Sequence, residues 1–468
     1  MRARGSGAER WRRSSIHTTG RRVAIDVDSG PVPATIVFAM LQESGHLNPT
    51  FRIARSLRER GIDVCYFARA DLAPVVERQG FRTLPWFPEL YPKGSSEADA
   101  ALPKLRQRRR ITQNFERMAR VLAEGQGPLA ALGGLPAPHV LADVTQPLMA
   151  FALRKAGVPF QYINTSLPQT HDGAVPPLRT ALPAASSLRT RLRNQLAWQR
   201  FGAQRLVSAA LAAPLGMCPT YALSALYARR FGLRAKDLEL TTTYLPQLRN
   251  VPELVLCPSG FDFPRPPRTG RTYGESIDLA RNEGPLELGT LDPASPLVYA
   301  SLGSQLYAAA EGRSFLQRLV RAVATRPDLN LLLSLGRHMR PEDLGTLPRN
   351  VHAVQSAPQL AVLQKASAML THGGLGSIKE CLYFGVPMLV CPLDVDQPGN
   401  AARVVHHGAG LRTALDEQSD AKILGMLDAL LRDPAIRERI GVLQREIRSL
   451  EAQAPGAAQL AAWCTLPA

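Results

Sequence analysis

The sequence predicts an α/β fold in which two parallel sheets each bury their own core. The chain has 468 residues, enough for two such domains. Near the N-terminus, the apolar runs 34–41 and 62–67 flank a segment of helical spacing that starts at Pro49, which is the pattern of a βαβ unit. The order strand, glycine turn, helix returns at 366–384 and predicts a second unit of the same kind.

The stretch 356–412 carries the strongest chemical signal. The apolar run 366–371 predicts a strand, His-Gly-Gly follows at 372–374, and 375–384 has helical spacing. Glycines let the backbone come close to a ligand, and a helix N-terminus offers unpaired N–H groups. This loop is therefore suited to bind an anion such as phosphate. The alternative is a generic βαβ unit whose glycines only make turns.

Polar side chains also follow the next predicted strand, 388–391. Asp396 and Gln397 come after its carboxyl end, which is where ligands of open parallel sheets bind. We expect both side chains to face a ligand.

The composition is that of an ordinary globular protein, with 45% hydrophobic and 20% charged residues. No apolar run is long enough to span a bilayer, so we expect a cytoplasmic protein. Residues 1–22 carry seven Arg and one Glu, which is +6 of the formal net charge of +17. We expect residues 1–30 to form a disordered basic tail, and we assign it no function.

Cysteine and histidine spacing gives no sign of a metal or a bound cofactor. The six Cys show no CxxC pair, which predicts reduced core thiols. No HExxH motif, Walker P-loop or dinucleotide fingerprint is present. We therefore expect no metal and no cofactor.

Two residues of the N-terminal half are candidates for proton transfer. His46 ends the loop 42–46 after the first strand and should face the crevice, and Asp143 follows the predicted strand 138–141. An imidazole can take a proton from a hydroxyl, and a carboxylate can fix its tautomer. The alternatives are a loop histidine without a task and an aspartate that caps the helix predicted at 147–156.

These motifs resemble those of family 1 nucleotide-sugar glycosyltransferases. The resemblance rests on the following residues: Ser44-Gly45-His46-x-x-Pro49, His372-x-Gly374-x-x-Ser377-x-x-Glu380, Gly385-Val386-Pro387, Pro392, Asp396-Gln397 and Asn400. It implies the GT-B fold, in which two Rossmann-like domains face a cleft and a C-terminal helix crosses back to the first domain. The expected parts are an acceptor-binding domain at 31–262, a linker at 263–295, a nucleotide-sugar-binding domain at 296–450 and the returning helix at 451–468.

The resemblance also implies a role for each matching residue. His46 would be the general base and Asp143 its partner. The expected donor contacts are the backbone of Ala357 to the base, Gln359 and Glu380 to the ribose, Ser304, His372, Gly374, Gly376 and Ser377 to the diphosphate, and Asp396 and Gln397 to the transferred sugar. For Ser304 the alternative is an ordinary turn serine.

Two departures from the plant members of this family concern the donor. They carry Trp where this chain has Ser356, and Trp-Asn where it has Leu375-Gly376. The missing ring leaves the base open between UDP, which we favour, and dTDP. The run 396–410 resembles bacterial carotenoid (zeaxanthin) glucosyltransferases most, together with macrolide-type enzymes.

The resulting hypothesis is an inverting glycosyltransferase that moves a hexose, glucose in the first place, from a nucleotide diphosphate sugar to a hydroxyl of a lipophilic small molecule. The alternatives are a sugar-nucleotide epimerase of the same fold and a non-catalytic nucleotide-sugar binding protein. A nucleic-acid partner is suggested only by the pI of about 10.1 and is not expected, because no aromatic and basic recognition motif is present.

Two basic stretches, 104–120 and 179–205, lie in the half expected to bind the acceptor. The second has six Arg, no acidic residue and interleaved Leu, Trp and Phe. Such stretches are commonly solvated helix faces, but this pattern is also that of a helix that rests on anionic lipid. We therefore expect a peripheral contact with an anionic membrane.

Overall fold

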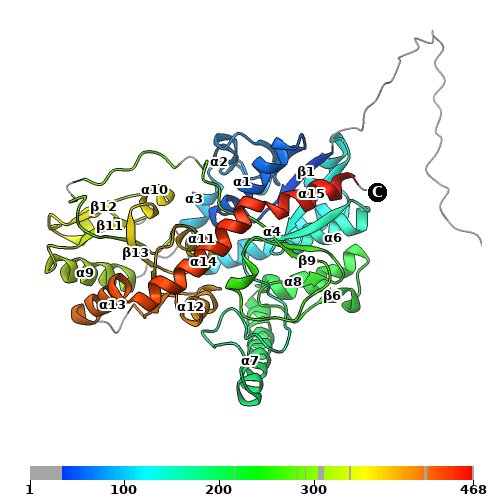
Figure 1. Cartoon of the computed structure of the whole chain (residues 1–468). Helices are drawn as coiled ribbons and strands as arrows, with labels where there is room; N and C mark the ends of the chain where they lie inside the picture. The colour runs from blue at the N-terminus through cyan, green and yellow to red at the C-terminus, as the bar shows by residue number, and fades with distance from the viewer. Residues whose placement is uncertain are drawn as a thin grey trace, which may run out of the picture. The chain divides into compact units, whose positions relative to one another are not determined.

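The computed structural model describes residues 34–465 except positions 216, 282, 290, 304–309, 337–338 and 416–418. The expected basic tail at 1–30 lies outside the described residues. Two parallel sheets organise the described chain (Figure 1). The first has the order β3-β2-β1-β4-β5-β8-β9, with bounds β1 Thr35–Ala39, β2 Asp63–Ala68, β3 Arg82–Pro85, β4 Pro138–Asp143, β5 Phe160–Asn164, β8 Glu253–Val255 and β9 Arg271–Tyr273.

The second sheet has the order β12-β11-β10-β13-β14-β15. Its strands are β10 Leu297–Ser301, β11 Asn330–Ser334, β12 Val351–Val354, β13 Ala366–Thr371, β14 Met388–Val390 and β15 Gly410–Arg412. A separate antiparallel pair joins β6 Leu238–Glu239 to β7 Gln247–Leu248. The two parallel sheets confirm the predicted α/β class with two Rossmann-like domains.

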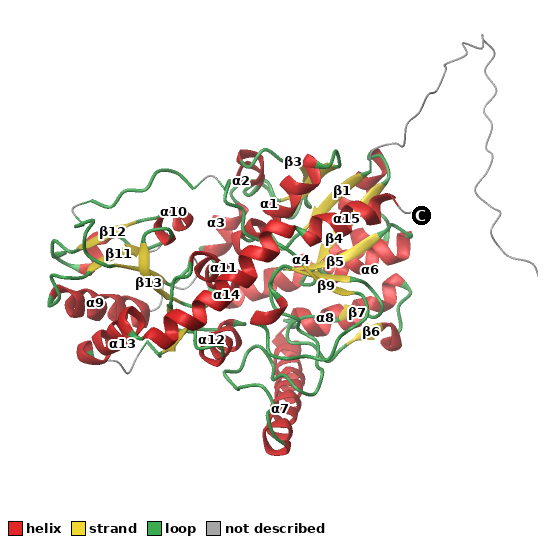
Figure 2. Cartoon of the chain, viewed as in Figure 1, coloured by secondary structure: helices red, strands yellow, loops and turns green. Residues whose placement is uncertain are grey.

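Helices connect the strands and cover the sheets (Figure 2). In the N-terminal half they are α1 Ser44–Glu59, α2 Ala73–Arg78, α3 Ser95–Ala100, α4 Lys104–Ala123, α5 Pro128–Ala131, α6 Pro147–Ala156, α7 Leu188–Ala212 and α8 Thr220–Tyr227. In the C-terminal half they are α9 Ala310–Ala324, α10 Gln359–Leu363, α11 Leu375–Phe384, α12 Gln397–His406, α13 Asp420–Arg432, α14 Pro434–Gln453 and α15 Pro455–Thr465.

Each sheet is buried on both faces, as expected for parallel strands covered by helices. Along β1, Ile36 and Phe38 belong to the core on one face, and Val37 and Ala39 to the core on the other. The strands of the second sheet alternate in the same way. Apolar residues therefore fill both sides of each strand, which explains the continuous apolar runs in the sequence.

The order of the strands reverses beside β1 in the first sheet and beside β10 in the second. β1 pairs with β2 on one side and β4 on the other, and β10 pairs with β11 and β13. At such a reversal the connecting helices leave on opposite faces, and a crevice opens outside the carboxyl ends of the strands. Each sheet thus offers one crevice, next to Ala39 and Asp143 in the first and Ser301 and Thr371 in the second.

The C-terminal helix returns to the first sheet, as predicted. Pro455 starts α15 after Ala454, and Ala457 and Leu460 join the apolar core over β1. The carboxylate of Glu275 accepts from the backbone N–H groups of Gly456 and Ala457, at 2.8 and 2.9 Å. An acceptor at this place satisfies N–H groups that have no partner inside the helix.

Two local predictions were wrong. The helix α1 begins at Ser44 and not at Pro49, so His46 lies in its first turn and Pro49 lies inside the helix. The run 253–257, which the sequence predicts to be the last strand of the N-terminal half, forms β8, but β9 follows it and pairs with it inside the stretch expected as a linker. Only three residues make β9, with Pro and Gly close by, and so short a run gives no periodicity to detect.

The cysteines are free thiols, as predicted, and four of the six are buried. Over the described ranges, no single helix is both long and apolar enough to cross a membrane. The pair Leu188–Leu215 and Thr220–Phe231 reaches the required length and composition together, but it is bent by 86°.

Candidate functional site

A cleft of about 1610 Å³ opens between the carboxyl ends of the two sheets. Residues from both halves line it, including ten of the predicted site residues: His46, Ala357, Gln359, His372, Gly374, Gly376, Ser377, Glu380, Asp396 and Gln397. Asp143 lies behind the surface of the cleft and is fully buried. Ser304 lies outside the described residues. The fold thus brings together residues more than 300 positions apart in the sequence.

His46 and Asp143 form an ion pair on the wall of the first sheet. The first turn of α1 carries His46 and the last position of β4 carries Asp143. The ring Nδ1 lies 2.7 Å from Asp143 Oδ2 and 3.0 Å from the hydroxyl of Thr165. The other contacts of the carboxylate come from the backbone N–H of Leu41 and from Thr145, which donates through both its N–H and its hydroxyl.

The surroundings of this pair shift both pKa values. Burial acts to lower the pKa of His46, but the charge of Asp143 and their hydrogen bond outweigh it, so the pKa lies above 6.5. Burial acts to raise the pKa of Asp143, and the charge of His46 and the hydrogen bonds from His46 and Thr145 lower it below 3.8. Asp143 is therefore ionised at neutral pH.

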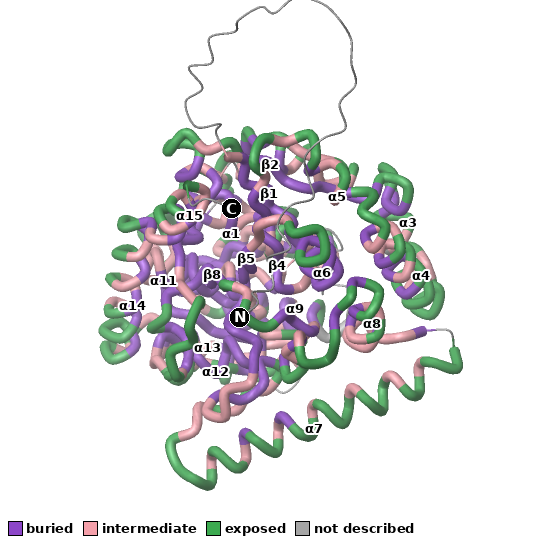
Figure 3. The backbone as a smooth tube through the Cα atoms, turned by 90° about the vertical axis from the view of Figure 1, so that its right-hand side faces the viewer, coloured by how far each residue is buried: buried purple, intermediate pink, exposed green. Residues whose placement is uncertain are grey.

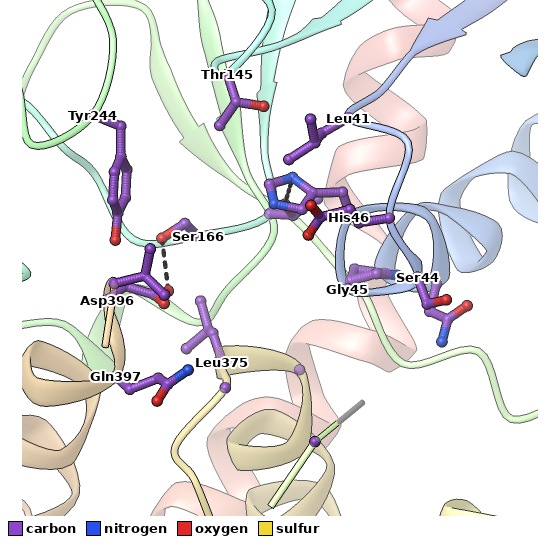
Figure 4. A pocket seen from close by; sticks show the side chains of 18 of the residues that line it. Leu41, Ser44, Gly45, His46, Thr145, Ser166, Tyr244, Leu375, Asp396 and Gln397 are labelled. Carbon is purple, nitrogen blue, oxygen red and sulfur yellow. Dashed lines mark hydrogen bonds between the residues drawn. The ribbon is translucent and has the colours of Figure 1, made fainter. Parts of the chain in front are cut away.

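This geometry suits a general base. A carboxylate on Nδ1 keeps the proton there and leaves Nε2 as the basic nitrogen. The side chain of His46 is 21% exposed and lines the cleft, where a substrate hydroxyl can reach it (Figure 4). The pair can accept a proton from a hydroxyl and stabilise the imidazolium that forms.

The opposite wall is the predicted anion site. The helix α11 begins at Leu375 after Gly374, and its first residues, including Gly376 and Ser377, line the cleft. A helix N-terminus presents free N–H groups and a partial positive charge, equivalent to about half an elementary charge. This end of α11 can therefore hold a diphosphate.

His372 fills the space beneath this helix end. A Cβ built on Gly303 or on Gly374 would come within 2.8 Å of the ring, so glycine is needed on both sides of it. Burial lowers the pKa of His372 to about 4. Nδ1 of the buried ring has no hydrogen-bond partner among the described residues. A neutral ring here can donate an N–H to an anion but cannot serve as a strong base.

A network of side chains surrounds Glu380 at the expected ribose position. Arg281 Nη1 donates to Glu380 Oε1 at 2.8 Å, and Gln359 Nε2 donates to Glu380 Oε2 at 2.5 Å and to Ser377 Oγ at 3.1 Å. The second partner of Arg281 is Glu283, at 2.6 Å. A carboxylate held in this way is fixed in orientation and can still accept from two adjacent hydroxyls.

The backbone of Ala357, expected to contact the base, lies at the same end of the cleft. Its N–H donates to the hydroxyl of Ser334, the last residue of β11, at 3.3 Å. The carbonyl of the same residue remains an acceptor for a base. Ala357, Gln359 and Glu380 thus lie together along β11, α10 and α11.

The two halves meet at Asp396. The hydroxyl of Ser166 donates to Asp396 Oδ2 at 3.2 Å (Figure 4). Gln397 is buried, and its side-chain Oε1 accepts from the backbone N–H groups of Leu393 and Asp394. Gln397 therefore also shapes the loop that carries Asp396. Both residues line the same cleft as His46.

Tyr244 lies on the same part of the wall, and its hydroxyl is buried without a hydrogen-bond partner among the described residues. Burial and then the charge of Asp396 raise its pKa well above 10. Tyr244 is therefore a neutral phenol whose hydroxyl can bond a ligand.

Sequence reasoning missed Thr165, Ser166, Tyr244 and Arg281. Thr165 and Ser166 directly follow β5, so the rule that located Asp143 at the end of β4 could have located them. Tyr244 lies in an irregular loop and Arg281 in the stretch expected as a linker, and no pattern marks either residue. Across the described positions, no group of three or more His, Cys, Asp or Glu could hold a metal ion.

Two Rossmann-like domains with crevices on one shared cleft define the GT-B class of fold. Residues 318–461 match the family described as "Erythromycin biosynthesis protein CIII-like, C-terminal domain". The chain is 26% identical over 439 residues to the 4'-demethylrebeccamycin synthase of Lentzea aerocolonigenes, covering 90% of this chain and 97% of that protein. It is 28% identical over 420 residues to the oleandomycin glycosyltransferase of Streptomyces antibioticus, covering 89% and 87%.

A solved structure agrees with these relatives. The crystal structure of the glycosyltransferase of kitacinnamycin superposes with a TM-score of 0.63 at 25% identity, covering 92% of this chain and 98% of that one. The chain thus has the GT-B fold and is similar to these proteins over about 90% of its length.

The predicted special likeness to carotenoid enzymes is not confirmed. The zeaxanthin glucosyltransferase of Pantoea ananas is 30% identical over 156 residues, which is 33% of this chain. The two antibiotic-related enzymes match over about 90%. The motif at 396–410 lies in the donor-binding half, so it carries little information on the acceptor.

Proposed function

We propose that this protein transfers a hexose from a nucleoside diphosphate sugar to a hydroxyl of a lipophilic small molecule, with inversion at the anomeric carbon. The observation that carries the proposal is the position of His46 and Asp143 across one cleft from the N-terminus of α11. A base must activate the acceptor on one side of the sugar, and an anion site must stabilise the leaving diphosphate on the other side.

The proposed steps follow from the two walls. His46 takes the proton of the acceptor hydroxyl as its oxygen attacks the anomeric carbon, and the bond to the diphosphate breaks on the opposite face. Negative charge gathers on the leaving diphosphate, and the N–H groups of α11, Ser377 and neutral His372 stabilise it. Asp143 stabilises the imidazolium that forms on the other side.

The donor is proposed to be a UDP-sugar, with dTDP as the alternative, and glucose is the first sugar to test. Ser356 cannot stack on a base as a Trp would, so recognition depends on the backbone of Ala357 and on the ribose contacts of Gln359 and Glu380. Asp396 and Gln397 are proposed to bind the hydroxyls of the sugar. No metal is expected to take part, and turnover should persist with EDTA present.

The acceptor class is supported by the relatives, whose names refer to demethylrebeccamycin and oleandomycin. Arg69, Trp86, Tyr91, Phe115, Met118 and Leu148 line the acceptor side of the cleft. Their largely apolar surface fits a lipophilic ring system.

The decisive experiment compares wild type with His46→Ala. UDP-glucose and dTDP-glucose are offered with a panel of lipophilic alcohols and phenols, and mass spectrometry follows the gain of one hexose. We expect His46→Ala to lower turnover about 10³-fold while calorimetry still shows nucleotide binding. Equal turnover in both proteins would show that the assignment of the base is wrong.

The epimerase alternative is separated by leaving the acceptor out. An epimerase converts the nucleotide sugar by itself, whereas a transferase consumes it only when a hydroxyl acceptor is present. NMR of the product distinguishes inversion from retention at the anomeric carbon.

A further inference from the structure

Helix α7 attaches to the protein through a polar and aromatic face. Asn194 is buried, and its side-chain amide donates to the backbone carbonyl of Ala174 at 3.1 Å. The indole of Trp198, one turn further on, donates to the carbonyl of Val175 at 2.9 Å. These two residues lie on the same side of the helix because they are four positions apart. The opposite side of α7 is therefore the side that faces outward.

The outward side is apolar. Five leucines there, 54% to 74% exposed, form what we call the outer face: Leu188, Leu192, Leu196, Leu206 and Leu211. The first three are spaced by four residues and lie in one row. A helix of a globular protein normally turns such a row toward the core, but here these leucines are exposed. Figure 3 shows that α7 is exposed along much of its length.

Positive charge borders the outer face, and negative charge is absent from this part of the sequence. Three arginines form an adjacent stripe. Arg189 and Arg193 each directly follow a leucine of the row, and Arg200 lies four positions after Leu196. The 64 residues from 173 to 236 contain nine Arg and one Lys and neither Asp nor Glu. A surface of this composition attracts an anionic apolar boundary.

We propose that the outer face of α7 docks the protein on an anionic lipid surface. The leucines would enter the boundary between headgroups and acyl chains while the arginines pair with phosphates. A second copy of this chain fits less well, since it would bring one arginine stripe against another.

A groove joins this surface to the active-site cleft. It has a volume of about 1200 Å³ and lies between α7 and residues 179–182. Arg179, Phe201 and Gln204 line both the groove and the cleft, so the two spaces adjoin each other. Provided that the proposed function holds, a lipophilic acceptor dissolved in the membrane reaches His46 by this route without crossing water.

Flotation of the full-length protein with vesicles tests the docking. One set of vesicles is phosphatidylcholine alone and the other contains phosphatidylglycerol as well. We expect binding only to the anionic set, and weaker binding as salt is raised because ions screen the arginines. Arg189→Gln with Arg200→Gln should weaken binding about tenfold.

A leucine variant and a matched control test the apolar part. Leu192→Ser, Leu196→Ser and Leu206→Ser together should weaken binding about a hundredfold. The control carries Leu279→Ser, Val405→Ser and Val442→Ser, three apolar side chains of 47% to 54% exposure elsewhere on the protein, and should bind as wild type does. Thermal unfolding of both variants checks that the fold is kept.

Three outcomes would overturn the proposal. The first is no binding to anionic vesicles at low salt, and the second is equal binding by the leucine variant and its control. The third is a dimer, seen by mass photometry, in which a second copy of the chain covers the outer face. The seven Arg of residues 1–22 are present in every variant, so they add the same background. The assay needs neither donor nor acceptor. Its failure would leave sugar transfer untouched, and absent transfer with intact vesicle binding would speak only against the proposed function.

Discussion

Two histidines, one in each half of the molecule, differ in the direction in which their surroundings shift the pKa. His46 follows β1 and His372 follows β13, each at the carboxyl end of a strand beside the reversal of strand order. Asp143 raises the pKa of His46 against the effect of burial. Burial without a carboxylate partner lowers the pKa of His372 to about 4. The same ring thus has a raised pKa on one wall and a lowered pKa on the other.

The difference teaches that the neighbours of the ring, and not its place in the fold, set its chemistry. Asp143 lies on the strand next to β1 and reaches Nδ1 of His46. In the second half, His372 has glycines beside it that bring backbone close to the ring. In the proposed mechanism, the first half serves proton transfer and the second half holds the anion.

The largest effect should come from removing the charge of Asp143, which makes the pKa of His46 differ from that of His372. Asp143→Asn keeps the size of the side chain but removes the anion that holds the proton on Nδ1. We expect kcat to fall about 10³-fold to 10⁴-fold with donor affinity unchanged. Steady-state kinetics and calorimetry with the nucleotide diphosphate measure the two quantities. A fall in donor affinity of the same size as the fall in kcat would break the division of tasks between the halves.

The next prediction concerns the carboxylate of the donor half. Glu380→Gln should raise the KM of the donor about tenfold to a hundredfold with little change in kcat, since a hydrogen bond to a charged group is worth about 1.5–3 kcal/mol. The control is Asp428→Asn on α13, which alters an ion pair with Arg326 outside the cleft lining and should leave KM unchanged. A lower kcat with unchanged KM would place Glu380 in the chemical step instead.

The pH dependence sharpens the comparison directly. Neutral His46 is the base, so turnover should fall as the pH drops through its pKa, and this acid limb should lie above 6.5 in the wild type. Without the charge of Asp143, burial dominates, and the limb in Asp143→Asn should move below 6.5. Donor binding depends on His372, whose pKa of about 4 keeps it neutral over about pH 5–8, so calorimetry should show no inflection there. An inflection near pH 6.5 in donor binding would contradict the neutral state of His372.

The smallest effect is expected where the halves meet. Tyr244→Phe removes a hydroxyl that has no partner among the described residues, so the thermal stability should hold or rise slightly. Because the hydroxyl is expected to bind substrate, kcat/KM should fall about fivefold. Tyr162→Phe is the contrasting variant, because that hydroxyl accepts the backbone N–H of Leu248 and its loss should lower stability. Unchanged kcat/KM in Tyr244→Phe would exclude Tyr244 from the site.

Much of the donor wall could be predicted from the sequence. The segment 375–384 was predicted as a helix with the bounds that α11 has, and the strand before it ends at Thr371 as expected. These residues are neighbours along the chain, so their spacing carries the geometry. Asp143 could be placed for the same reason, because the carboxyl end of a parallel strand always lies at the crevice.

The sequence by itself determined the α/β class, the two crevices and the residues that stand at strand ends, because periodicity and strand ends are local properties of the chain. Only the tertiary structure decided that Asp143 reaches Nδ1 of His46, that Arg281 binds Glu380, and that the leucines of α7 face outward. Each of these depends on segments that meet through folding or on which side of a helix finds a partner. Spacing along one chain contains no record of such contacts.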